Sequence, residues 1–364
     1  MPLEPRGTII PYRHDRIPVG GRMQVPDLHL NTTAFICLEE LGASGAINVP
    51  RATAFFVIDR SGKSPPHPVW IVTGRHCIQE ARASGRPMFV RVNTATTYRD
   101  LPTSPDDWHE SDDADVAVAL WKPQHVAGGT EMPTITSIPL DQFIPSDYRY
   151  RGAKDFPIPG PLAEKGQMVK VGHELFFVGL FSQHAGKAKN LPIARFGAIA
   201  RLPVEPVSVK RSDGSTESIH GYLVEMRSWG GHSGSPVFWY YPAVEVHFFP
   251  TPPNAPGQKM GREERRKKGI TPQPSHIPIS KEFGVIALLG IVSAHFDIPQ
   301  SAKTSGDVLG SIITPLNAGI AVVTPAHKII DLLQRSDVIE ERLKHAEIAI
   351  EEPAATYDVV KNDT

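Results

Sequence analysis

Cysteine is scarce in this sequence, and long apolar runs are missing. Only Cys37 and Cys77 occur among 364 residues, far too few for a scaffold stabilised by disulfides, and we expect both to be free, buried thiols. No segment is apolar for long enough to span a bilayer, and the start of the chain lacks the apolar core of a secretory signal. We therefore expect a cytoplasmic protein with no membrane partner.

An excess of charge of one sign is also lacking. The formal net charge is −1, so the chain has no general field that would attract nucleic acid. Its histidines show neither an H-E-x-x-H pattern nor pairing with cysteines at zinc-ligand spacing. We therefore expect no nucleic-acid partner, no metal and no cofactor, and the oligomeric state is left open.

Glycine and proline are abundant, and the apolar runs between them are short. The chain has 30 glycines and 35 prolines, which favours many short strands joined by turns over long helices. Apolar or β-branched runs occur in one set at 33–38, 52–58, 69–73, 88–92 and 116–120, and in a second set at 174–180, 195–200, 222–226, 237–241, 285–294 and 319–323. Two sets of this size predict a mainly all-β fold with two six-stranded antiparallel β-barrels and C-terminal helices.

The segments around these strands predict the domain organisation. We expect an N-terminal extension over 1–29, a first barrel over 30–121, an inter-barrel connection over 122–166 and a second barrel over 167–335 that ends in a helix opened by Pro325. Residues 247–281 form a basic, proline-rich insertion, either a solvated loop or a regulatory, partner-binding one. A capping box at Asp337 and Glu340 predicts a second helix, with Val338 and Leu343 on its apolar stripe, and a disordered tail completes 336–364.

The run Gly-Gly-His-Ser-Gly-Ser-Pro at 230–236 carries the clearest chemical signal. A serine between small residues exposes its hydroxyl for attack on a carbonyl, while neighbouring backbone N–H groups stabilise the oxyanion. Both a double β-barrel and an α/β-hydrolase elbow use such a run. Pro236 and the aromatic, β-branched residues after it predict a strand where the elbow needs a helix. An esterase that uses Ser233 with Asp297 and His327 is the second enzyme alternative.

Two upstream blocks supply partners for Ser233 in the order that a double-barrel hydrolase requires. His76 lies in Trp-Ile-Val-Thr-Gly-Arg-His-Cys (70–77), and Asp115 lies in Asp-Ala-Asp-Val-Ala-Val (113–118). The ordered blocks resemble those of trypsin/chymotrypsin-like serine peptidases of the bacterial and intracellular type. Asp113 is the alternative acid, but only Asp115 directly precedes the apolar strand. The segments 289–295 and 317–325 resemble strands of high-temperature-requirement-type protease domains, here without a peptide-binding domain.

The resemblance implies a serine endopeptidase that acts on protein or peptide substrates. Ser233 would attack the peptide carbonyl, His76 would transfer the proton, and Asp115 would orient His76. The backbone N–H groups of Gly231 and Ser233 would form the oxyanion hole. His232 stands where secreted members have the aspartate that receives a new N-terminus, so we expect no zymogen latch. A catalytically inactive peptide-binding protein on the same fold is the non-enzyme alternative.

The resemblance also implies where a substrate would lie. The strand at 289–295, which contains Ser293, would pair with an extended peptide through its main chain. Arg227 precedes Ser233 by six residues and corresponds to the base of the pocket for the residue before the scissile bond, and His295 corresponds to the wall of that pocket. Two basic groups there predict a preference for an acidic side chain.

Overall fold

The structure is a computed structural model of the chain, and it describes residues 8–9, 24–43, 45–60, 67–122, 131–153, 156–157, 166–211, 213–226, 231–241, 246–248, 279–281, 285–298 and 316–351. The chain divides into a larger unit, which contains Met1–His14, Val25–Tyr240 and Ile286–Thr364, and a smaller unit, which contains Asp15–Gln24 and Tyr241–Val285. In the smaller unit, β21 (Val246–Phe248) pairs with β22 (Ile279–Lys281). The rest of the basic insertion lies outside the described residues.

The first half of the chain forms an eight-stranded sheet in the order β6-β5-β2-β3-β4-β8-β7, with β10 paired in parallel to β3 beside this path. The strands are β2 (Thr33–Gly42), β3 (Gly45–Ile58), β4 (Val69–Thr73), β5 (Met88–Asn93), β6 (Tyr98–Thr103), β7 (His109–Glu110), β8 (Ala117–Leu120) and β10 (Ser137–Pro139). β4 and β8 are buried at every position, as continuous apolar runs predict for strands covered on both faces. β4 therefore leads into α2, and β8 follows the loop that carries Asp115, both from buried positions.

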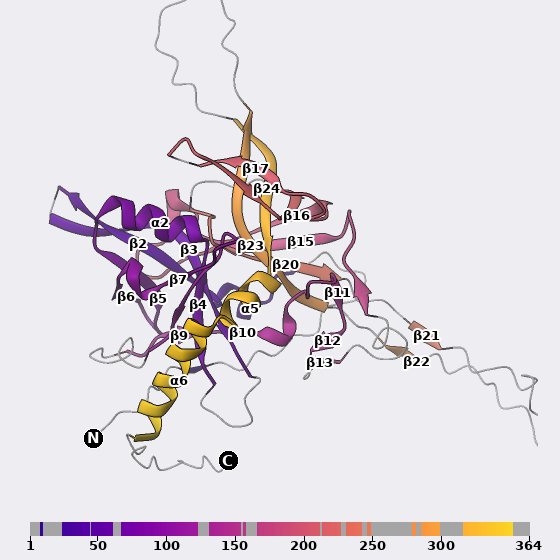
Figure 1. Ribbon diagram of the computed structural model, residues 1–364, viewed down its shortest axis with the longest axis horizontal. Helices are drawn as coiled ribbons and strands as arrows, with labels where there is room; N and C mark the ends of the chain where they lie inside the picture. The colour runs from indigo at the N-terminus through magenta and orange to yellow at the C-terminus, as the bar shows by residue number, and fades with distance from the viewer. Residues whose placement is uncertain are drawn as a thin grey trace, which may run out of the picture. The chain divides into compact units, whose positions relative to one another are not determined.

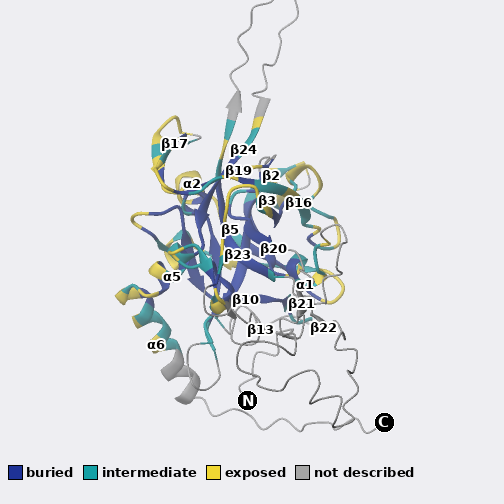
Figure 2. Ribbon diagram, turned by 90° about the vertical axis from the view of Figure 1, so that its right-hand side faces the viewer, coloured by how far each residue is buried: buried dark blue, intermediate teal, exposed yellow. Residues whose placement is uncertain are grey.

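In the second half, six strands close into a barrel in the order β15-β16-β19-β24-β23-β20 (Figure 1). They are β15 (Glu174–Gly179), β16 (Ile193–Arg201), β19 (Tyr222–Glu225), β20 (Pro236–Tyr241), β23 (Val285–Ile298) and β24 (Leu316–Pro325). In Figure 2 the ribbons of β5, β20 and β23 run through the buried interior. The mainly β fold class with an antiparallel barrel is thus confirmed. Among the described residues, the first-half sheet has β6 at one edge and β7 at the other.

Shorter elements connect and cover these sheets. The two-stranded pairs are β1 (Thr8–Ile9) with β9 (Thr134–Ile135), β11 (Arg149–Tyr150) with β14 (Gln167–Met168), β12 (Gly152–Ala153) with β13 (Phe156–Pro157), and β17 (Val207–Lys210) with β18 (Thr216–Ile219). The helices are α1 (Asp27–Leu30), α2 (Arg75–Ser84), α5 (His327–Leu333) and α6 (Ser336–Glu351). No helix among the described residues combines the length and the apolar character needed to cross a membrane.

The helix α2 was not anticipated from the sequence. It begins directly after β4, with Gly74 as an extended N-cap residue, and ends at Gly85, whose φ of 63° lies in the left-handed region. Glycine adopts that conformation at little steric cost, which makes it a common helix stop. The buried face of α2 includes His76 and Cys77, so the helix fixes the predicted catalytic histidine at the end of a buried strand.

The C-terminal helices differ in detail from the prediction. Pro325 is the last residue of β24, and α5 begins only at His327. Helix α6 begins at Ser336, so Asp337 lies in its first turn. The predicted apolar stripe is buried at Val338, but Leu343 is 54% exposed. The reason is that α6 is held to the sheet largely by charged contacts.

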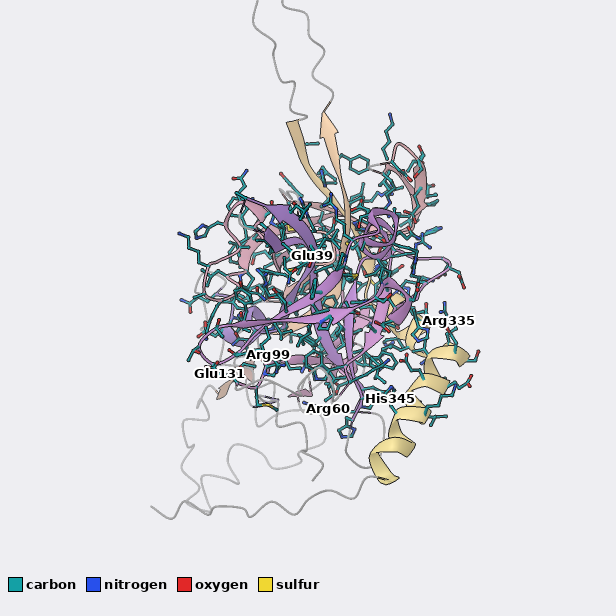
Figure 3. All side chains as sticks on the ribbon, turned by 90° about the vertical axis from the view of Figure 1, so that its left-hand side faces the viewer. Glu39, Arg60, Arg99, Glu131, Arg335 and His345 are labelled. Carbon is teal, nitrogen blue, oxygen red and sulfur yellow. The ribbon has the colours of Figure 1, made fainter. Side chains whose placement is uncertain are left out.

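Those charged contacts join the C-terminal helices to the end of β7. His109 Nδ1 lies 3.0 Å from Asp337 Oδ2, and His109 Nε2 lies 2.7 Å from Glu341 Oε2. Because each ring nitrogen must donate a proton to a carboxylate, this geometry requires the imidazolium cation. Arg335, which Figure 3 labels beside the helical segment, donates from Nη1 to the Glu110 carbonyl at 2.6 Å. The helices therefore fix the strand end that leads into the loop carrying Asp115.

Docking of α6 is expected to depend on the charge of His109. Hydrogen bonds to Glu341 raise the pKa of His109 above its ordinary value, and those to Asp337 add to this against the opposing effect of burial. A raised pKa in the folded state gives stabilisation that is complete below about pH 6.5 and is lost as the pH rises through the raised value. In His109→Gln, backbone amides of α6 should therefore exchange with deuterium faster than in the wild type at about pH 6, whereas the two proteins should match at about pH 9.

The control for this comparison is His220→Gln, which removes an exposed histidine and should leave the exchange of α6 unchanged at both pH values. Equal exchange of α6 in wild type and His109→Gln at the lower pH would contradict the proposed role of the cation.

Candidate active site

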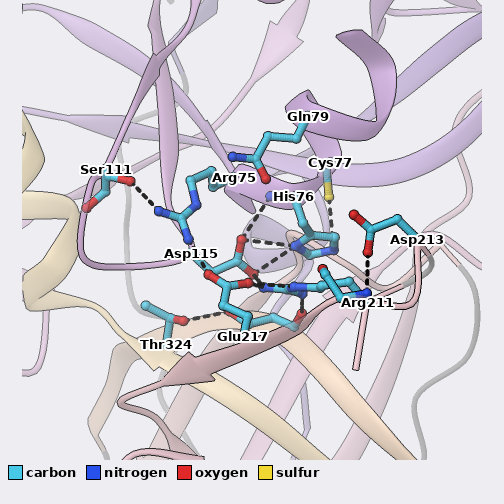
Figure 4. Close-up of polar contacts among 12 residues, drawn as sticks. Arg75, His76, Cys77, Gln79, Ser111, Asp115, Arg211, Asp213, Glu217 and Thr324 are labelled. Carbon is cyan, nitrogen blue, oxygen red and sulfur yellow. Dashed lines mark hydrogen bonds and ion pairs between the residues drawn. The ribbon is translucent and has the colours of Figure 1, made fainter. Parts of the chain in front are cut away.

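A buried carboxylate holds the imidazole at the start of α2. Asp115 Oδ2 lies 2.8 Å from His76 Nδ1, and Asp115 Oδ1 lies 3.0 Å from the same nitrogen and accepts the His76 backbone N–H at 2.9 Å (Figure 4). Asp115 is completely buried, and His76 is 8% exposed. Two contacts to the ring and one to the backbone fix both the position and the orientation of the imidazole.

The charges of this pair stabilise each other. Burial by itself raises the pKa of Asp115, but the adjacent His76, followed by Arg211, outweighs burial and holds that pKa well below its usual range. For His76, burial acts to lower the pKa, whereas the charge and hydrogen bonds of Asp115 raise it well above the ordinary value. The pair therefore favours an ionised carboxylate and a strongly basic imidazole.

The structure separates the two candidate acids. Asp113, the alternative, is 67% exposed and forms an ion pair with Lys328 at 2.7 Å. Its pKa is lowered chiefly by the hydrogen bond from Lys328. Asp115 and not Asp113 contacts His76. The position next to the buried strand, which distinguished the two in the sequence, is what carries Asp115 into the interior.

The outer nitrogen of the imidazole faces a thiol. Cys77 Sγ lies 3.5 Å from His76 Nε2, and both cysteines are free and buried, as predicted. No hydrogen bond joins Ser233 Oγ to His76 in the part of the chain that the structure describes. The Cys77 thiol is therefore the contact that His76 Nε2 makes among the described residues.

The loop before β20 presents Ser233 between two glycines in left-handed conformations. Gly231 has a φ of 97° and Gly234 a φ of 81°. A Cβ atom at Gly234 would lie 2.1 Å from the Thr53 carbonyl oxygen, so only glycine fits. Among the described residues, neither the Gly231 N–H nor the Ser233 N–H donates a hydrogen bond. Two free donors beside an accessible serine are the groups that a carbonyl under attack requires.

Thr53 of β3 holds this loop against the first sheet. Its backbone N–H donates to the Ser233 carbonyl at 2.9 Å, and its Oγ1 donates to the Gly231 carbonyl at 2.8 Å. The same Oγ1 accepts the Leu180 N–H at 2.9 Å. Thr53 is completely buried. Because Thr53 binds the Gly231 and Ser233 carbonyls, the loop that carries Ser233 is held against β3.

His232 is completely buried, with its ring in an edge contact to Phe177 at a centroid distance of 4.8 Å. Burial lowers its pKa to about 3, with smaller contributions from the charges of Arg195 and His295. A neutral imidazole in this place offers no carboxylate to an N-terminal ammonium group. The absence of a zymogen latch stays a prediction, and the buried, neutral ring of His232 is consistent with it.

The predicted substrate-binding residues lie in different settings. Ser293 sits at an irregularity in the pairing of β23 with β24, and its Oγ lies 2.7 Å from Thr324 Oγ1. Its carbonyl accepts a hydrogen bond from Arg211 Nη1 at 2.8 Å. His295 is exposed on β23. Arg227 lies outside the described residues.

Arg211 is the site residue that the sequence analysis missed. It follows β17 and contacts Asp115 across more than ninety positions of the chain, with Nη2 at 3.3 Å from Asp115 Oδ2. The only local signal was the Asp213-Gly214 pair, a typical hairpin turn. That pair predicts a hairpin between 207 and 219 but does not indicate where its side chains point.

The elbow alternative does not fit this structure. Ser233 is followed by the strand β20 instead of a helix, and β20 belongs to a closed antiparallel barrel. The strand predicted at and after Pro236 is thus confirmed. His327, the histidine of that alternative, begins α5 and lies against Tyr148 at a centroid distance of 6.3 Å.

No protein-family model and no curated protein sequence matches the chain. Among solved structures, the active form of the Rv3671c protease from M. tuberculosis is similar over 92% of this chain and 93% of that chain, with 14% identity and a TM-score of 0.35. The inactive form of the Rv3671c protease is similar over 84% of this chain and 88% of that chain, with 12% identity and a TM-score of 0.34. The function of this chain therefore has to be inferred from its own residues.

Replacing Thr53 should loosen the Ser233 loop. Thr53→Val keeps the shape of the side chain but leaves the buried Leu180 N–H and Gly231 carbonyl without a partner. Each such group costs about 1–3 kcal/mol, so we expect a loss of about 2 kcal/mol or more in the free energy of unfolding, measured by urea denaturation. Thr53→Ser keeps the hydroxyl and should lose less than half as much. Equal stabilities of the valine variant and the wild type would show that the hydroxyl is not a structural link.

Proposed function

We propose that the protein is a serine endopeptidase in which Ser233 is the nucleophile, His76 the general base and Asp115 the residue that orients it. The observation that carries the proposal is the buried Asp115–His76 pair, with Nδ1 and Oδ2 2.8 Å apart. The serine loop lies close to the start of α2, since a Cβ atom at Gly234 would lie 3.2 Å from the Gly74 nitrogen, and its Gly231 and Ser233 N–H groups donate to no described residue. We also propose the cytoplasm as its location, protein or peptide chains as its substrates, and the first-half sheet as the other barrel of a double-barrel, trypsin-like fold.

The proposed reaction uses the Asp115–His76 pair together with the hydroxyl and N–H groups of the Ser233 loop. Because Asp115 holds the proton on Nδ1, the lone pair of His76 is on Nε2 and can accept the Ser233 proton. Ser233 Oγ attacks the peptide carbonyl carbon, and the oxyanion accepts hydrogen bonds from the Gly231 and Ser233 N–H groups. The imidazolium then protonates the leaving amine, which leaves an acyl-enzyme. Water, deprotonated by His76, hydrolyses the ester and restores Ser233.

Ser233 is preferred over Cys77 as the nucleophile. Cys77 Sγ lies 3.5 Å from His76 Nε2, but Cys77 is only 6% exposed and lies within α2. Ser233 is half-buried and lies beside the free N–H groups of its own loop. Cys77 belongs to the buried face of α2, whereas attack on a substrate carbonyl needs an accessible nucleophile beside oxyanion donors. The thiol is therefore a partner of the resting base.

We further propose that Arg227 and His295 favour an acidic side chain before the scissile bond, and that the main chain around Ser293 binds the substrate as an added strand. Support comes from the exposure of His295 on β23 and from the sequence pattern around Arg227. Peptides that differ only in glutamate or leucine at that position test the preference. Equal kcat/KM values for the two would contradict it.

Substitution of Ser233 tests the proposed nucleophile. With casein and fluorogenic peptide libraries as substrates, Ser233→Ala should lower kcat by at least about a thousandfold, since a triad member contributes that much or more. Ser235→Ala is the matched control because Ser235 is completely buried two residues away, and it should stay within about twofold of the wild type. Cys77→Ala should also retain activity. Loss of activity in Cys77→Ala but not in Ser233→Ala would make the thiol the nucleophile.

A folded wild type with no hydrolysis of any substrate would instead favour the peptide-binding alternative.

The pH dependence of kcat/KM tests the base. Only the neutral form of His76 can accept the Ser233 proton, and its pKa is raised. Activity should therefore rise with pH through a value above the ordinary pKa of about 6.5. Asp115→Asn removes the charge that raises this pKa, so its acid limb should move to lower pH while kcat falls. An acid limb in the wild type below the ordinary value would contradict the assignment of His76.

A further inference from the structure

The hairpin β17–β18 extends from the second barrel to the Asp115–His76 pair. Its strands pair from Val207 opposite Ile219 to Lys210 opposite Thr216. Val209 and Ile219 are almost completely buried and pack with Val322 of β24, beside which the hairpin lies in Figure 1. This apolar base fixes the hairpin, so the residue that follows β17 reaches the site from a defined position.

That residue, Arg211, contacts three separate acceptors. Nη2 forms an ion pair with Asp115 Oδ2 at 3.3 Å, and Nε donates to Glu217 Oε2 at 2.6 Å (Figure 4). Nη1 donates to the Ser293 carbonyl at 2.8 Å. The Arg211 side chain is 12% exposed. A planar guanidinium can serve three acceptors in different directions at once, whereas a lysine ammonium on a flexible stem cannot do so with the same geometry.

The charges around Arg211 alternate in sign. Glu217 of β18 forms ion pairs with both Arg211 and Arg75, and Arg75 Nη1 donates to the Ser111 carbonyl at 2.7 Å. Arg75 directly precedes His76 in α2. Burying a charge is costly unless it is paired, and here each charge faces one of opposite sign. The network thus runs from Arg75 of α2, through Glu217 and Arg211 of the hairpin, to the Asp115 carboxylate.

We propose that Arg211 is a positioning residue for the reaction: it holds Asp115 against His76 and ties that pair to the Ser293 carbonyl of β23, while Glu217 balances its charge. The inference rests on the proposed peptidase function, since it assigns the support of that same site. Arg211 acts through two groups. Asp115 orients the proposed base, and β23 is the proposed substrate-binding strand.

Removing the charge of Arg211 and removing the charge of Glu217 should shift the pKa of His76 in opposite directions. Asp115, from the loop before β8, and the Cys77 thiol contact the His76 ring. The charges of the hairpin act through Asp115, because Arg211 is paired with Asp115 and Glu217 is paired with Arg211. Arg75 of α2 is paired with Glu217. Removal of the Arg211 charge leaves Asp115 free to stabilise the imidazolium more strongly. Removal of the Glu217 charge leaves Arg211 uncompensated and disfavours the imidazolium. The first change should raise the pKa of His76, and the second should lower it.

The experiment compares Arg211→Met, Arg211→Lys, Glu217→Gln and the double variant Arg211→Met/Glu217→Gln. The pKa of His76 is measured by NMR titration of histidine-labelled protein, which needs no activity, and kcat, KM and the pH profile are measured on a peptide that the wild type cleaves. Lys210→Met is the control because it removes a positive charge from an exposed position next to Arg211. Thermal unfolding of each variant reports whether it folds.

We expect Arg211→Met to raise the pKa of His76 by about one unit and to lower kcat about tenfold or more, with a smaller change in KM. Glu217→Gln should lower that pKa. The double variant should return the pKa towards the wild-type value while kcat stays low, because positioning is still lost. Arg211→Lys should restore the pKa but only part of kcat, and Lys210→Met should change neither.

Wild-type pKa and kcat in folded Arg211→Met would overturn the inference, as would pKa shifts of the same sign in Arg211→Met and Glu217→Gln. If Arg211→Met does not fold, Arg211→Lys and Glu217→Gln are compared with the wild type instead. A wild-type pKa of His76 and a wild-type kcat in both variants would overturn the inference. Should the wild type cleave nothing while the NMR titrations shift as expected, the peptidase proposal fails and the electrostatic link between hairpin and histidine stands.

Discussion

The structure depends most on the burial of the Asp115 carboxylate. An ionised carboxylate with no solvent exposure is stable only if its partners replace the hydration that it loses. The His76 ring, the His76 backbone N–H and the Arg211 guanidinium all supply such contacts. These partners come from two distant parts of the chain, the start of α2 and the residue after β17. The carboxylate therefore acts as the point at which helix, loop and hairpin are brought together.

The elements around this point are held in place by longer-range contacts. The C-terminal helices bind the end of β7 through His109 and Arg335, which fixes the strand before the Asp115 loop. On the other side, Thr53 connects β3 to the carbonyls of Gly231 and Ser233. The proposed base thus lies in the first half of the chain and the proposed nucleophile in the second. Both are held to the first-half sheet, the base through β4 and the nucleophile through β3.

Much of the strand content could be predicted from the sequence because buried strands are short, apolar and β-branched and are bounded by glycine or proline. The pairing of His76 with Asp115 was predicted from the resemblance of their sequence blocks to those of trypsin/chymotrypsin-like peptidases; His76 follows one buried strand and Asp115 precedes another. The contacts of Arg211, Thr53 and Cys77 were not. They join residues through side-chain direction and tertiary packing, which leave no periodic or local pattern. The helix α2 was missed because its first turn follows a strand without a polar cap residue.

Covalent labelling is the most direct test of the claim that Ser233 is activated by the buried pair. The protein is treated with a fluorophosphonate, digested and mapped by mass spectrometry. One adduct on Ser233 is predicted, with slower labelling of Asp115→Asn at neutral pH because its imidazole is no longer held and polarised. An adduct on Ser235 or another residue, or no adduct on correctly folded protein, would contradict the account.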